Sequence, residues 1–112
     1  MTIMTRSRSN VKKLKRKVKR ILLMCKLQYA NLDILCDEHQ YEGAMFIFGF
    51  AEAFCPDLIE FLENPNLPKD LRYPCYEAGM RFQMLYGIIT SKFYGEMKCP
   101  TYNFDKWGNN KN

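Results

Sequence analysis

The stretch that decides the fold reads NVKKLKRKVKRILLMCKLQYANLDILCDE and covers residues 10–38. Its apolar side chains recur at alternating steps of three and four residues, which is the spacing of one face of an α-helix. They are Val11, Leu14, Val18, Ile21, Cys25, Leu32 and Leu35, and only Gln28 interrupts the series. The pattern predicts a helix of about seven or eight turns at roughly 3.6 residues per turn.

The two halves of this predicted helix differ in chemistry. In the first half, seven cationic side chains surround a narrow apolar seam: Lys12, Lys13, Lys15, Arg16, Lys17, Lys19 and Arg20. In the second half, which begins at Ile21, apolar residues cover most of the circumference. We expect the first half to lie in water or against a polyanion and the second half to be buried.

The charge of the whole chain is divided in the same way. The 112 residues include 17 Lys and Arg residues and 12 Asp and Glu residues, which gives a net charge of +5. Residues 1–26 hold ten of the basic residues and no acidic one, whereas residues 27–112 hold seven basic and all 12 acidic residues. A chain of this length forms one compact core, so we expect a single domain with a basic arm and an acidic body.

The remaining elements are also predicted to be helical. Residues 42–55, EGAMFIFGFAEAFC, are apolar on nearly every side, and they predict a buried helix because no second strand-like run exists to pair with them. A short helix should begin at Pro56 and end at residue 63. The segment NPNLPKDLRYP, residues 64–74, has three prolines and predicts a loop with at most one helical turn. The last long helix should run from Pro74 to Phe93, with Gly95 as its stop.

We therefore expect an all-α fold: a small helical domain, expected to be oligomeric, with a long basic N-terminal helix, a central buried apolar helix and a long C-terminal helix. Residues 1–9 are expected to form a basic flexible leader, residues 10–95 the helical domain, and residues 96–112 an irregular tail. Within the tail, three aromatic side chains can dock on the body as isolated anchors: Tyr102, Phe104 and Trp107.

Cysteine usage and hydropathy favour an intracellular protein. The five cysteines cannot all pair within one chain, and the first ten residues contain no apolar segment of signal-peptide length. No apolar run approaches the roughly 20 residues of a membrane-spanning helix. We expect reduced thiols and a cytoplasmic location without a membrane partner, or a nuclear location if the source is eukaryotic, because KKLKRKVKR is typical of import signals.

The charges at the two ends of the predicted first helix both oppose the helix dipole. Cations lie at its amino end, and Asp33, Asp37 and Glu38 lie at its carboxyl end. Either bound phosphates or an antiparallel second copy of the chain would relieve this mismatch. We expect a homo-oligomer because the seam between Val11 and Val18 lies far from the rest of the chain, although this part could simply lie over the chain's own body. The predicted oligomer or partner interface is Val11, Leu14, Val18 and Ile21.

The sequence contains no catalytic motif, so we expect no enzyme activity, no catalytic residue, no metal and no cofactor. Cys36 and His39 have the C-x-x-H spacing of zinc sites, but a second pair of ligands is missing. A small core residue and a helix-end residue are the simpler interpretation. Glu52 interrupts an apolar stretch and should pair with Arg72 or Arg81 or lie on a wet edge.

The leading prediction is a non-enzymatic binding protein whose N-terminal helix contacts nucleic acid, mainly through the phosphate backbone. Aromatic residues lie elsewhere in the chain, so base stacking and strong sequence preference are not expected. The predicted nucleic-acid-binding residues are Arg8, Lys12, Lys13, Lys15, Arg16, Lys17, Lys19 and Arg20.

Two alternatives remain open. In the first, the chain is a protein-interaction module, such as a phage or viral inhibitor or adaptor, that binds an acidic host protein surface with Leu14, Val18 and Ile21 as apolar anchors. In the second, it sequesters a small ligand such as a cyclic nucleotide in a pocket between subunits, lined by basic residues and by Tyr73 or Tyr76.

Overall fold

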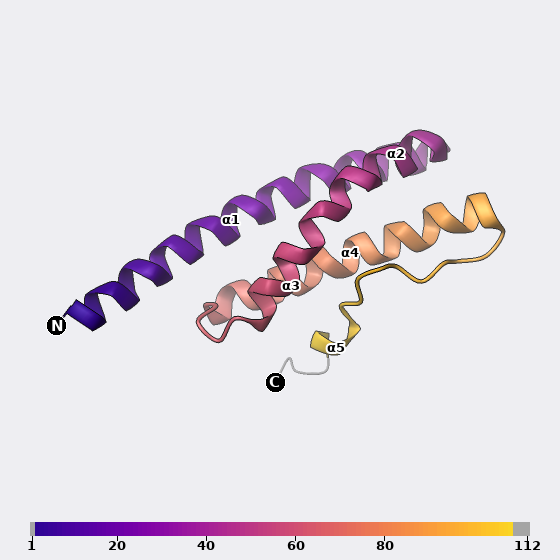
Figure 1. Cartoon of the computed structure of the whole chain (residues 1–112). Helices are drawn as coiled ribbons and strands as arrows, with labels where there is room; N and C mark the ends of the chain where they lie inside the picture. The colour runs from indigo at the N-terminus through magenta and orange to yellow at the C-terminus, as the bar shows by residue number, and fades with distance from the viewer. Residues whose placement is uncertain (1, 109–112) are drawn as a thin grey trace.

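The structure, a computed structural model, describes the backbone of residues 2–108 and the side chains of residues 10–108. The described part consists of helices and the segments that connect them, and it contains no strand, which confirms the all-α class. Five α-helices and one 3₁₀ turn follow one another in the order α1 (Thr2–Asp37), α2 (Tyr41–Ala51), η1 (Glu52–Phe54), α3 (Cys55–Glu63), α4 (Lys69–Tyr94) and α5 (Asp105–Gly108) (Figure 1).

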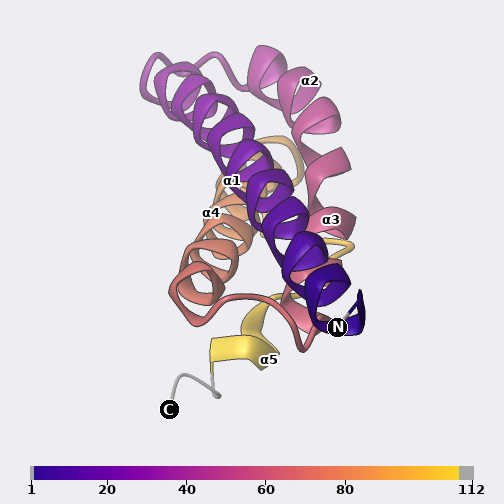
Figure 2. The same ribbon diagram turned by 90° about the vertical axis from the view of Figure 1, so that its left-hand side faces the viewer.

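The molecule is elongated because α1 runs along its whole length. Its principal extents are 58 × 25 × 18 Å. Helices α2 and α4 both pack against α1, and α3 packs against α4, so that the core lies between these helices. The segment after α4 turns back along that helix and ends in α5 (Figure 1). In Figure 2, α1 runs toward the viewer, with α2 and α3 on its right and α4 on its left.

Helix α1 is longer than the periodic stretch predicted. It begins at Thr2, so the segment expected to precede the helix continues it instead. Its carboxyl end closes as a Schellman motif: the amide of His39 donates to the carbonyl of Cys36 at 3.1 Å, and the amide of Gln40 donates to the carbonyl of Leu35 at 2.8 Å. His39 adopts a positive φ of 59°, the left-handed conformation that this motif needs. His39 therefore ends a helix, as the simpler interpretation held.

The expectation of a central buried apolar helix is wrong for α2. Only Ala44, Phe48 and Ala51 of this helix are buried. Phe46 and Phe50 are 68% and 61% exposed, and their rings stack edge to face on each other at 5.2 Å. A chain of 112 residues has too few helices to cover both sides of α2, so the apolar residues outnumber the inward-facing positions.

The start predicted for the last long helix is also wrong. Helix α4 begins at Lys69, with Pro68 as its N-cap, and Pro74 lies inside it. The missing amide of Pro74 removes one hydrogen bond near the amino end, but contacts with α3 hold this turn in place. Leu71 is buried, and the Arg72 guanidinium donates to the carbonyl of Leu62 at 3.0 Å. The other end agrees with the prediction, since Gly95 has a φ of 75° and ends the helix.

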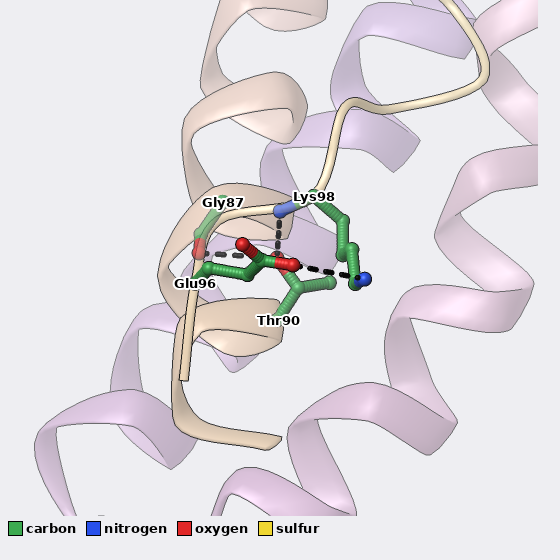
Figure 3. Close-up of polar contacts among 4 residues, drawn as sticks. All are labelled: Gly87, Thr90, Glu96 and Lys98. Carbon is green, nitrogen blue, oxygen red and sulfur yellow. Dashed lines mark hydrogen bonds and ion pairs between the residues drawn. The ribbon is translucent and has the colours of Figure 1, made fainter. Parts of the chain in front are cut away.

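The tail after α4 is docked on the body, as its aromatic residues predicted. Phe104 is buried, and its backbone amide donates to Oε1 of Gln83 at 3.0 Å. Earlier in the tail, soon after α4 ends, the amide of Lys98 donates to Oγ1 of Thr90 at 3.0 Å. This hydroxyl donates to the carbonyl of Gly87 at 3.2 Å (Figure 3). Two separate hydrogen-bonded points thus fix the tail along α4.

Candidate nucleic-acid interface

The apolar seam of α1 is covered by the chain's own helices. Val18, Cys25 and Leu32 are fully buried, and Ile21 is buried as well. Leu14 packs against the edge of the same core. The expectation that a second chain covers Val18 and Ile21 is therefore wrong. It failed because α3 returns to this part of α1, as the position of the Lys17 ammonium, 6.0 Å from the Phe61 ring centre, indicates.

The seven predicted cations of α1 are all exposed: Lys12, Lys13, Lys15, Arg16, Lys17, Lys19 and Arg20. The ion pairs in the described part of the chain lie elsewhere, between Arg81 and Asp33, Lys98 and Glu96, and Lys106 and Glu63. The side chain of Arg8 lies outside the described residues. Within residues 10–108, the positive charge of α1 is thus not neutralised by the protein itself.

Four of these cations lie together on one face of the helix. Lys12, Lys15, Arg16 and Lys19 line an open depression in the surface. From Lys12 to Lys19 the helix rises about 10 Å, which is the axial rise of about three nucleotides of a DNA strand. Lys13, Lys17 and Arg20 flank this group on the neighbouring face. Such a row can contact several consecutive phosphates at once.

The helix dipole does not act on the cations in the way the sequence suggested. Because α1 begins at Thr2, its amino end lies about ten residues before Lys12, and the dipole effect is confined to the first turn. At the carboxyl end the expected mismatch is present, since the last turn holds no basic residue. Arg81 of α4 reduces it by pairing with Asp33 at 3.4 Å, and its guanidinium also lies 4.9 Å from the centre of the Tyr29 ring.

The other candidate residues do not assemble into a second site. Glu52 is half-buried and lines a small cavity of about 10 Å³, which has room for about one water molecule. Its expected partners are engaged elsewhere, Arg81 with Asp33 and Arg72 with the carbonyl of Leu62. Tyr73 and Tyr76 lie side by side on α4, with ring centres 6.1 Å apart, and do not line the depression on α1.

The buried cysteines behave as core residues. Burial raises the pKa of Cys25, Cys55 and Cys75 to about 12, and for Cys25 the other two thiols add to the rise. Such thiols stay protonated and are poor nucleophiles and metal ligands. In residues 10–108, no group of three or more His, Cys, Asp or Glu side chains has the arrangement of a metal site.

One surface was missed by reading the sequence. The second half of α1 was expected to be buried, yet Leu23, Leu27 and Ile34 are 59%, 60% and 54% exposed. Their helical spacing places them on the face opposite the buried seam, and their exposure means that no other described helix covers that face. Their own steps of four and seven residues were a usable signal, but the denser inner seam concealed it.

No protein-family model, curated protein or solved structure matches this chain. None of the described helices is both long and apolar enough to span a membrane. The surface chemistry of α1 is therefore the basis for proposing a function.

Proposed function

We propose that this protein is a non-enzymatic nucleic-acid-binding protein that contacts the phosphate backbone through the first half of α1. One observation carries the proposal: seven exposed cations occupy nine consecutive residues, 12–20, without an ion-pair partner in the described part of the chain. Phosphates bound there would release condensed counterions, which is the main source of non-specific affinity for nucleic acid.

The roles of the cations follow from their places on the helix. Lys12, Lys15, Arg16 and Lys19 line the common depression and form the main contact. Lys13, Lys17 and Arg20 add charge at its side, and Arg8 stays in the proposed set because of its charge. The exposed side chains of this segment are cationic and not aromatic, so the contact favours phosphates over bases and sequence preference should be weak.

A protein-interaction module is the second candidate, and one observation favours it. The exposed apolar side chains Leu23, Leu27 and Ile34 continue along α1 beyond the cations, which suits a protein surface better than a phosphate backbone. In this version the anchors are these three residues, because Val18 and Ile21 are buried and cannot insert into a partner. A cytoplasmic or nuclear location and a role as an inhibitor or adaptor remain predictions.

Fluorescence anisotropy with a labelled DNA duplex and a labelled single-stranded RNA tests the proposal. Affinity should fall steeply between about 50 and 200 mM salt. The variant K12Q/K15Q/R16Q/K19Q should reduce the slope of log K against log salt by up to about 3.6 on a duplex, at roughly 0.9 per phosphate contact. The matched control is K69Q/K92Q/K98Q/K106Q, which removes the same charge from exposed lysines outside α1.

The control variant should keep nearly all of the parent's affinity. Absence of binding at low salt would refute the proposal. Equal losses in the two quadruple variants would also contradict it, since they would reflect net charge alone.

A further inference from the structure

The outer face of α1 carries a second stripe of side chains, on the side away from the core. Leu23, Leu27, Ala30 and Ile34 are all exposed and follow one another at steps of four, three and four residues. This is the spacing of a seam between two paired helices. Helices α2 and α4 pack against α1. The four residues of the stripe remain exposed, so the described part of the chain leaves the stripe open.

The stripe ends in opposite charges. Arg20 lies three residues before Leu23, and Asp37 lies three residues after Ile34, and both are exposed. The stripe therefore runs from a cation through four apolar side chains to an anion. If a second identical stripe is laid against it in the opposite direction, each residue meets its complement. Arg20 then faces Asp37 of the second copy, Leu23 faces Ile34, and Leu27 faces Ala30.

We propose that the outer face of α1 binds a second copy of this chain, with the two α1 helices antiparallel about a two-fold axis near residues 28 and 29. The two copies bring eight apolar side chains into one seam, and an Arg20–Asp37 pair closes it at each end. Antiparallel pairing also brings the helix dipoles into a favourable relative orientation. The contact uses a different face from the buried seam of Val18 and Ile21.

The order of the charges along the stripe favours a second copy of this chain over other partners. An anionic lipid surface or a uniformly acidic protein would attract Arg20 but would be repelled by Asp37 and the neighbouring Glu38. A second copy presents an anion where the first presents a cation, and the reverse. The exposed pair Phe46 and Phe50 on α2 has an anion, Glu42, one turn before it but no cation one turn after it, so its ends do not complement a second copy.

The dimer uses Arg20 of the candidate nucleic-acid interface, and it leaves the cations before Arg20 in solution. Lys15 is about 13 residues from the axis, or about 20 Å along the helix, beyond the end of the partner's α1. The two cationic segments therefore project from opposite ends. Dimerisation does not depend on nucleic acid, so its test is independent of the proposed function.

Sedimentation equilibrium over a protein concentration series, without nucleic acid, measures the self-association. The parent should be a dimer at micromolar concentrations, and L27K should be a monomer. The matched control is M84K, because Met84 is 62% exposed on α4, outside the proposed contact. This variant should dimerise like the parent. Circular dichroism checks that both variants retain their helix content.

A charge exchange tests the direction of the pairing. R20D and D37R should each weaken the dimer about tenfold or more, because like charges then meet at both ends. An equimolar mixture of the two variants, and the double variant R20D/D37R, should recover dimer formation, because opposite charges face each other again. A monomeric parent, a dimeric L27K, or a mixture that stays monomeric would each overturn the proposal.

Discussion

The inner and outer faces of α1 both carry apolar side chains at steps of three and four residues, yet their surroundings differ. On the inner face Val18, Cys25 and Leu32 are fully buried, whereas Leu23 and Leu27 on the outer face remain more than half exposed. The inner face is covered because α2, α3 and α4 all lie on that side. Periodicity thus defines the faces of a helix, and the number and placement of its neighbours decide which face becomes core.

Equal truncations on the two faces should have unequal effects. L32A should lower the free energy of unfolding by about 2–5 kcal/mol, because it opens a cavity in the core. L27A makes the same chemical change on an exposed side chain and should cost less than about 0.5 kcal/mol in dilute solution. Urea unfolding followed by circular dichroism provides the measurement.

The losses of stability in L32A and L27A should also depend differently on protein concentration. The loss in L32A should be the same at every concentration, because it arises within one chain. The loss in L27A should grow at concentrations where the parent dimerises, because the dimer stabilises only the folded state. Equal losses in the two variants at low concentration would contradict the assignment of an inner and an outer face.

The buried thiols offer a way to probe the inner face by pH. Cys25, Cys55 and Cys75 have pKa values raised from 9.0 to about 12, chiefly by burial. Between these values the folded chain holds more protons than the unfolded chain, so stability is complete below about pH 9 and falls as the pH rises toward 12. From pH 8 to pH 10 the loss should reach up to about 1.4 kcal/mol for each thiol.

The difference in pH dependence between variants is the quantity to compare, because it isolates the contribution of one thiol. Denaturant unfolding at pH 8 and pH 10 should show a smaller pH-dependent loss in C25A than in the parent. The matched control is C99A, because Cys99 is exposed and lies outside the core. A pH-dependent loss in C25A as large as in the parent would show that the Cys25 thiol does not titrate in the predicted way.

Reading the sequence was most successful where local chemistry decides the structure. The extent of α3, the stop at Gly95 and the docking of Phe104 all follow from turn residues or isolated anchors. Pro74 was misread as a helix start because the contacts of Leu71 and Arg72 with the rest of the fold, which hold the preceding turn, join residues distant in sequence. The exposure of Phe46 was missed for a related reason, since it depends on how many helices remain to cover α2.

Some features of the candidate interface could also be predicted from the sequence, and others could not. The exposure of Lys12 and its neighbours follows from their charge, because an unpaired cation is costly to bury. The burial of Val18 could not be read from the sequence, because it requires α3 to return to the first half of α1. The open stripe at Leu27 was missed because the denser inner seam of the same helix concealed its spacing.

Two glycines, Gly79 on α4 and Gly49 on α2, allow the same comparison between a covered and an open helix face. The covered face is the one beneath the tail. Gly79 lies beneath the ring of Phe104, and a Cβ atom added there would overlap that ring. G79A should therefore displace Phe104 and lower the free energy of unfolding by about 1–3 kcal/mol. Gly49 on α2 has no neighbouring atom within 4 Å of the added Cβ, so G49A should raise it by about 0.5–1 kcal/mol through helix propensity.

The fluorescence of Trp107, the single tryptophan of the chain, distinguishes the two effects. Its ring centre lies 5.9 Å from that of Phe104, so release of the tail in G79A should shift the emission to longer wavelength. G49A should have the same emission as the parent, because a Cβ atom added at Gly49 on α2 does not contact the tail. A G79A variant with the parent's emission and thermal stability would mean that Phe104 does not cover α4, and that this face is as open as the outer face of α1.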